Sequence, residues 1–294
     1  MSAGRLALAL VALLGASPAL SAHAATAAEP AAGAGEMSET DVNKKLTNPI
    51  SDIWSLTFQN NLYYLRLDTF HTNRWQDSLN FQPVIPLPLT RRLNLISRAV
   101  FNVVNSTPRV SGRGELERTT AFGDTIFASL LASNDPHLLI GVGPSFVFPT
   151  ASSDATGQGK WQSGAAAVLG YLSEKWIVGV FPQQWWSTGG SGPRQTEQLN
   201  AQYFFSYFLE HGRSIGTSPN LLVDWKADSG DRVTFPVGLS VDKVVKVGGK
   251  LPVRFGVQLQ YMPVHPDDGQ RLNAQLIVSP VLPSLVKSPL FGGP

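Results

Sequence analysis

Apolar and polar residues alternate along most of this chain with a period of two, not the period of 3.6 that an amphipathic helix would show. From Val253 to Tyr261 every second residue is apolar, and the residues between them are one Arg, one Gly and two Gln. Similar alternation runs through Leu199–Leu209, Val233–Val241 and Leu272–Val278. Because successive side chains of a strand point to opposite faces, each segment has one apolar and one polar face. The pattern predicts an all-β chain.

About twelve such segments can be counted, with bounds that are loose by about 2–4 residues. An even number of antiparallel strands is typical of single-chain bacterial barrels, whose chain ends lie on one side of the membrane. Closure also removes the unpaired edges of an open sheet. We therefore expect a closed antiparallel transmembrane β-barrel with strands at 53–67, 76–86, 93–105, 120–132, 137–149, 161–172, 175–188, 197–210, 214–226, 232–245, 252–263 and 269–280.

The connections between these segments fall into two groups. Those after every second strand are short and contain turn residues, such as Asn134-Asp135-Pro136. Most of the others are longer, such as Ser106–Thr119 and Thr150–Lys160, although Ala227–Asp231 and Val264–Asp268 are no longer than the turns. Short periplasmic turns and longer outer loops are the rule in transmembrane barrels. The sorting favours a membrane barrel over a soluble sandwich.

The first 24 residues have the three parts of a secretory signal peptide. Arg5 precedes the apolar run Leu6–Ala16, and Ala22-His23-Ala24 is a small-residue cleavage site. The run is shorter than the roughly 20 residues that a membrane-spanning helix needs. The prediction is a cleaved signal peptide and export to the bacterial outer membrane.

Composition sets the remaining domain bounds and excludes several classes. Residues 25–47 lack apolar periodicity and are predicted to be a flexible periplasmic lead-in, with a plug inside the barrel as the alternative. The barrel is assigned to 48–280, and 281–294 is a tail with three further prolines. The absence of cysteine excludes a disulfide scaffold and thiolate zinc sites. A net charge of +2 gives no basic face for nucleic acid.

The tryptophans lie near the ends of the predicted strands. Trp and Tyr favour the level of the lipid headgroups because their rings are amphipathic. An interfacial girdle is therefore expected at Trp54, Trp75, Trp161, Trp176, Trp185, Trp186 and Trp225.

No residue pattern points to an enzyme, a metal site or a cofactor. The histidines are far apart, and no metal-binding spacing such as HExxH occurs. Gly157-Gln158-Gly159-Lys160 lacks the spacing of a phosphate-binding loop. Ser145 lies in Gly143-Pro144-Ser145-Phe146 and does not have the full Gly-x-Ser-x-Gly of a nucleophile elbow. Ser214 near His211 is the closest approach to the Ser-His pair of an outer-membrane phospholipase, but it falls at a predicted periplasmic turn. We expect no catalytic activity.

The polar face of the strands predicts the lumen lining, in which amides outnumber charges. A strongly ion-selective pore would need a ring of one sign, which the pattern lacks. The alternatives are a narrow polar path or a lumen that its own side chains fill, and the interior width of twelve strands favours the path. The residues assigned to the lumen include Gln59, Asn80, Gln82, Arg98, Asn102, Gln202, Asp224, Asp242, Arg254, Gln258, Gln260 and Gln275.

One hairpin allows a sharper prediction. Lys246–Lys250 reads as a turn centred on Gly248, and residues equidistant from that centre should lie opposite each other. Asp242 then faces Arg254 on the polar side of the sheet. The expected result is an ion pair inside the barrel, unless a bulge at the glycines shifts the register.

Several longer segments resemble one bacterial family. The opening Asn48-Pro49-Ile50-Ser51-Asp52-Ile53-Trp54 is similar to the start of outer-membrane proteins of the MetA-pathway-of-phenol-degradation type, some of which carry the label "neuromedin U". Further similar segments are Phe58–Asn61, Leu79–Pro86, Gly141–Pro144, Pro149–Ala151, Gly157–Trp161 and Phe235–Val245. The resemblance covers about Asn48 to Pro280. It implies an outer-membrane barrel that passes small aromatic or apolar compounds, and it carries no established ligand set.

Three functions therefore remain open. The first is a passive, porin-like channel or transporter for small hydrophobic or aromatic compounds. The second is a structural or interaction barrel without transport, and the third is a soluble secreted β-protein that binds apolar ligands. The partners expected for a membrane barrel are the lipid bilayer, small apolar or aromatic solutes and the outer-membrane assembly machinery.

Overall fold

The computed structural model describes residues 37–286 and 288–291. The predicted signal peptide at 1–24 and residues 25–36 of the predicted lead-in lie outside the described residues, as do 287 and 292–294 of the tail. Within the described ranges, no helix is both long enough and apolar enough to cross a membrane.

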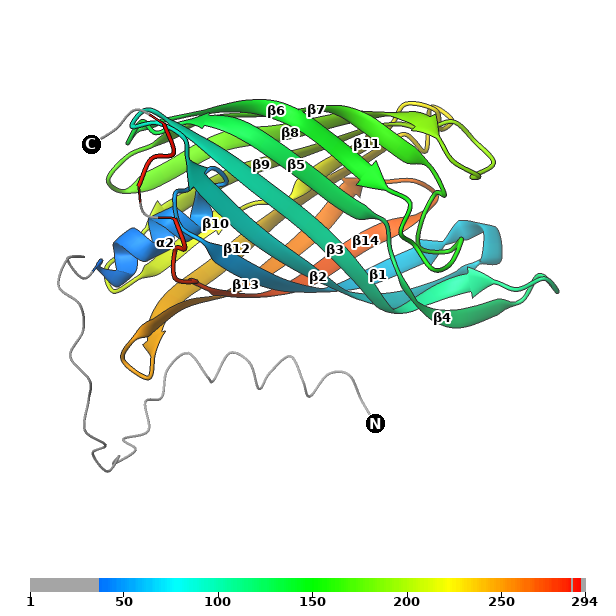
Figure 1. Ribbon diagram of the computed structural model, residues 1–294. Helices are drawn as coiled ribbons and strands as arrows, with labels where there is room; N and C mark the ends of the chain where they lie inside the picture. The colour runs from blue at the N-terminus through cyan, green and yellow to red at the C-terminus, as the bar shows by residue number, and fades with distance from the viewer. Residues whose placement is uncertain (1–36, 287, 292–294) are drawn as a thin grey trace. The chain divides into compact units, whose positions relative to one another are not determined.

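The strands form one antiparallel sheet that closes on itself (Figure 1). The first strand pairs with the last, so that Phe58 lies opposite Val278. The strands are β1 (Ser55–Leu67), β2 (Thr72–Pro88), β3 (Leu93–Val110), β4 (Leu116–Phe122), β5 (Thr125–Ser133), β6 (Leu138–Phe148), β7 (Trp161–Leu172), β8 (Trp176–Gly189), β9 (Glu197–Phe208), β10 (Arg213–Thr217), β11 (Asn220–Asp224), β12 (Val233–Val247), β13 (Leu251–Val264) and β14 (Asp268–Pro280).

Two positions in the wall are each filled by two short strands. β4 and β5 both pair with β3, and β10 and β11 both lie between β9 and β12. Ser218-Pro219 separates β10 from β11, where proline cannot donate a ladder hydrogen bond. The wall therefore has twelve strands, and the predicted closed twelve-stranded antiparallel barrel is confirmed.

The two ends of the barrel differ in their connections. At the end that carries the helix α2 (Glu39–Thr47), here the helix end, the turns are 89–92, 134–137, 173–175, 209–212 and 248–250. The opposite end, here the loop end, carries the long connections 149–160, 190–196 and 225–232. The sorting of short turns and long loops is thus largely as predicted. The loop expected at Ser106–Thr119 is wrong, because β3 and β4 continue there as a hairpin.

Local hydrogen bonds fix the short turns. In the turn between β5 and β6, the backbone N–H groups of Leu138 and His137 donate to Asp135 Oδ1 at 2.7 and 2.8 Å. These bonds hold the pKa of the Asp135 carboxyl below its ordinary value, because they stabilise the ionised form.

The prediction of a flexible lead-in up to residue 47 is wrong for Glu39–Thr47, which form α2. Ser38 caps the helix, since its hydroxyl oxygen accepts a hydrogen bond from the backbone N–H of Asp41 at 3.1 Å. Acidic residues in the first turn and lysines in the last turn complement the helix dipole. Packing decides the rest: Asn43 is 0% exposed and donates to Gly212 O at 3.1 Å and Ser214 Oγ at 3.0 Å.

The hairpin of β12 and β13 corrects the predicted register and keeps the predicted ion pair. Asp242 lies opposite Gly256, and Arg254 lies opposite Val244, so the turn is centred on Gly249 rather than Gly248. A slip of two residues leaves every side chain on its own face. Arg254 Nε and Asp242 Oδ1 are 3.8 Å apart on the inner face, as a diagonal pair.

Gly256 makes room for this pair. A Cβ at that position would lie 2.2 Å from Asp242 Oδ1, whereas a Cβ at Gly189 would meet no atom within 4 Å. We expect Gly256→Ala to lower the free energy of unfolding by about 1–3 kcal/mol, the usual cost of overpacking a filled interior. Urea unfolding of the protein in lipid vesicles measures it, with Gly189→Ala as the control. Equal stability of the two variants would contradict the packing argument.

Candidate solute pathway

A cavity of about 590 Å³ occupies the interior of the barrel toward the loop end. Amides predominate on one part of its wall and apolar side chains on another, although Gln162 lies among the apolar residues. The polar side carries amides from six strands: Gln59, Asn80, Gln82, Asn102, Gln183, Gln198, Asn200, Gln202 and Asn220. The apolar side carries Val100, Val104, Ile126, Ala128, Val147, Phe181 and Trp185.

The twelve predicted lumen residues fall into four groups. Gln59, Asn80, Gln82, Arg98, Asn102 and Gln202 line the main cavity. Arg254 and Gln275 line a smaller cavity toward the helix end, and Asp224 lines a cavity among the loops. Asp242, Gln258 and Gln260 line none of the three cavities, because they are buried in contacts inside the barrel.

The amides near β14 form hydrogen bonds with one another. Asn61 Oδ1 accepts hydrogen bonds from Asn273 Nδ2 at 3.2 Å and Gln275 Nε2 at 2.9 Å. Gln258, which is 0% exposed, accepts a hydrogen bond from Ser218 Oγ at 3.1 Å. This side of the lumen is filled, as in the alternative of a lumen closed by its own side chains, whereas the side near β3 and β8 is open.

The alternation of polar and apolar residues missed the apolar side of the cavity. Trp185 is 4% exposed and points inward, with its indole Nε1 donating to Ser145 Oγ at 2.8 Å. Its predicted place in an interfacial girdle is therefore wrong. The neighbouring Trp186 points outward, as two consecutive strand residues must. This alternation could have revealed the error from the sequence, because two adjacent tryptophans of a strand cannot both face lipid.

Arg98 lies at the boundary between the two cavities inside the barrel. Its Nη1 donates to the carbonyl oxygen of Pro49 at 3.2 Å, and its Cζ lies 5.1 Å from the centre of the Phe181 ring. None of the carboxylates that the structure describes forms an ion pair with it. Four amides share this boundary: Gln59, Gln82, Gln202 and Asn220.

The N-terminal segment closes the barrel below this boundary. The smaller cavity of about 100 Å³ is bordered on that side by residues 45–49. Arg254 Nη1 donates to Leu46 O at 3.1 Å, from the strand β13. Ile50 packs on the opposite side of the lumen, in an apolar cluster with Ile96, Ala128, Leu130, Ala132, Leu139, Ala166, Val168, Ile177, Phe181, Phe204 and Phe208. The segment 39–54, here the plug segment, thus spans the helix end.

At the loop end a third cavity of about 470 Å³ borders the main one. The two share Asp154, Gly157 and Gln158 from the connection 149–160. Asp124 holds this connection in place, since its carboxylate accepts the backbone N–H groups of Ala151 at 3.2 Å and Gln158 at 2.9 Å. Two adjoining cavities therefore lie between the loops and Arg98.

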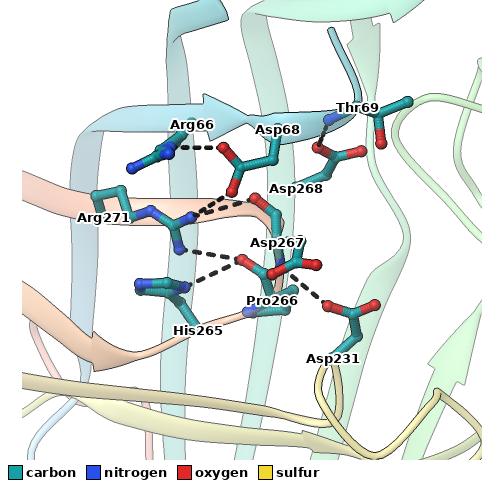
Figure 2. A network of polar contacts seen from close by, with 9 residues as sticks. All are labelled: Arg66, Asp68, Thr69, Asp231, His265, Pro266, Asp267, Asp268 and Arg271. Carbon is teal, nitrogen blue, oxygen red and sulfur yellow. Dashed lines mark hydrogen bonds and ion pairs between the residues drawn. The ribbon is translucent and has the colours of Figure 1, made fainter. Parts of the chain in front are cut away.

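A polar network joins three loop-end connections near the junction of the first and last strands (Figure 2). Asp68 pairs with Arg66 at 2.6 Å and with Arg271 at 3.3 Å. Asp231 accepts the backbone N–H of Asp267 at 2.9 Å. Despite these carboxylates, no group of three or more potential metal ligands occurs in the described chain.

The outer surface of the wall is apolar. Leu239 and Leu259 lie opposite each other and are each 62% exposed. The exposed tryptophans are Trp75, Trp161, Trp186 and Trp225, and Tyr64 packs edge-on against Trp75 with ring centres 5.1 Å apart. This surface is far larger than the apolar patches that soluble monomers expose.

Ser214, which follows His211 by three residues in the sequence, is buried in this structure. Ser214 is 1% exposed, and its hydroxyl oxygen accepts the bond from Asn43.

No protein-family model and no curated protein matches the chain. Among solved structures, an outer membrane channel from Pseudomonas putida F1 is similar, with a TM-score of 0.59 and 14% identity over 80% of this chain and 98% of that one. Outer membrane phospholipase A from Escherichia coli matches 81% of this chain and 99% of its own, at 12% identity and a TM-score of only 0.38. The first likeness shows the fold of a closed outer-membrane type of barrel.

Proposed function

We propose that this chain is an outer-membrane channel through which small hydrophobic or aromatic compounds pass passively. The observation that carries the proposal is the pair of adjoining cavities between the loops and Arg98, whose walls combine amides with apolar side chains. Such a wall suits a solute that has an apolar ring and a few polar groups. The similar fold of the Pseudomonas putida channel supports the same class of function.

The surface and the turns support the placement in the membrane. The apolar outer face with exposed tryptophans suits a lipid bilayer. Short turns at the helix end support a periplasmic position for that end, with the long loops outside. Export through the signal peptide and insertion by the outer-membrane assembly machinery belong to this proposal.

The competing function is a barrel that anchors or interacts without transport. A barrel without transport would account for the filled side of the lumen and for the plug segment. It would give no reason for the open cavities. The two functions are distinguished by whether a solute crosses the membrane through the barrel.

Reconstituted protein tests this directly. We expect liposomes that contain the protein to take up labelled phenol derivatives too polar to cross lipid rapidly, such as hydroquinone glucoside, faster than empty liposomes. Liposomes with an unrelated closed eight-stranded barrel are the control. Uptake at the rate of that control, with correctly folded protein, would refute the channel and favour the anchor.

A further inference from the structure

Arg98 is a cation inside the barrel that lacks a matching anion. Its partners are one neutral carbonyl oxygen and the face of one ring. The other lumen arginine, Arg254, has Asp242 as its counter-ion 3.8 Å away. The other guanidinium N–H groups of Arg98 have no acceptor among the residues that the structure describes. A charge removed from bulk water without a counter-ion is costly, so an incoming anion is stabilised there.

The surroundings of Arg98 select the kind of anion. A guanidinium presents parallel N–H groups that match the two oxygens of a carboxylate. Phe181 and Val100 provide an apolar wall beside it. Gln59 and Gln82 also line this cavity, and each amide has a second N–H besides the one that it donates to a neighbouring amide. A small planar molecule with a carboxylate at one edge satisfies all of these groups together.

We propose that Arg98 is the anion-binding residue of a site for small aromatic carboxylates on the floor of the main cavity. This inference rests on the proposed channel function, and it narrows the solute class. The carboxylate binds the guanidinium, and the ring packs on the apolar side of the cavity. The carbonyl of Pro49 occupies one of the same donors, so the solute competes with a contact of the plug segment.

Equilibrium dialysis of the full chain in detergent, with labelled benzoate as the probe, tests the site. We expect saturable binding that falls roughly 10- to 100-fold in Arg98→Gln, the range for loss of a charged hydrogen-bond partner. Benzyl alcohol, which has the ring without the charge, should bind weakly and equally to both proteins. Arg92→Gln is the matched control, because it removes the same charge from an exposed turn.

The outcomes separate the site from the channel. Unchanged benzoate binding in Arg98→Gln, or no saturable benzoate binding to the wild type, would overturn the site even if neutral solutes cross liposomes. Persistent binding that depends on Arg98, without flux of any solute, would leave the site standing and refute the channel. If acetate displaces labelled benzoate as well as unlabelled benzoate does, the aromatic part of the assignment fails. Heat-modifiable migration on gels confirms that each variant is folded.

Discussion

Deletion of Glu39–Thr47 is expected to raise solute flux through the barrel by an order of magnitude or more. The helix and the residues after it span the helix end. Asn43 of the helix donates a hydrogen bond to Ser214 on β10, and Arg254 on β13 donates one to the carbonyl oxygen of Leu46. Without them, the smaller cavity opens to the solution at that end. Single-channel conductance in planar bilayers and liposome uptake measure the change. The barrel should still fold, because the closing pair of β1 and β14 lies after the deletion.

The absence of cysteine gives this prediction a matched control. Asn43 and Ser214 are in direct contact, so the double variant Asn43→Cys and Ser214→Cys should form the sole disulfide of the chain. We expect low flux in the oxidised protein and higher flux after reduction. Equal flux in both states, with wild-type flux in the deletion, would show that solutes pass without any movement of the plug segment.

The wall of the barrel was predictable because it repeats one simple constraint many times. A strand between lipid and lumen must alternate, and each wrong bound shifts only an end, as at Thr72 and Arg213. The predicted register of the hairpin of β12 and β13 was wrong by two residues for a related reason. Alternation fixes the face of Asp242 and Arg254, but only turn geometry fixes which residues are opposite.

The cavity and the plug segment were less predictable, because they depend on contacts between segments that are far apart in the sequence. The capping serine Ser38, the acidic first turn and the lysines that follow were a readable signal for α2, but nothing local says that Asn43 fills a pocket formed by β10. Phe181 and Trp185 break the apolar-out rule, since the lumen near β8 is itself partly apolar. The lack of a counter-ion at Arg98 is a property of the whole interior, so no single segment encodes it.

Arginine on the outer face should block assembly, and this is the most direct test of the membrane barrel itself. Leu259 lies on β13 opposite Leu239 and is widely exposed on the outer face. Placing arginine there costs about 2–4 kcal/mol if the position lies near the bilayer midplane, which lowers the folding equilibrium constant roughly 30- to 700-fold. We expect Leu259→Arg to lose the heat-modifiable form in outer-membrane extracts, and to unfold at lower urea in vesicles.

The matched control places an arginine on the inner face of the barrel instead. Ile126 also carries an aliphatic side chain in a strand, but it lines the main cavity, where Asp124 lies two residues away on the same face. Ile126→Arg therefore keeps access to water and gains a carboxylate nearby, so it should assemble as the wild type does. Equal loss of both variants would mean that the site of the charge is irrelevant. Equal tolerance of both would contradict a lipid-facing outer surface, and with it the membrane placement on which the proposed channel depends.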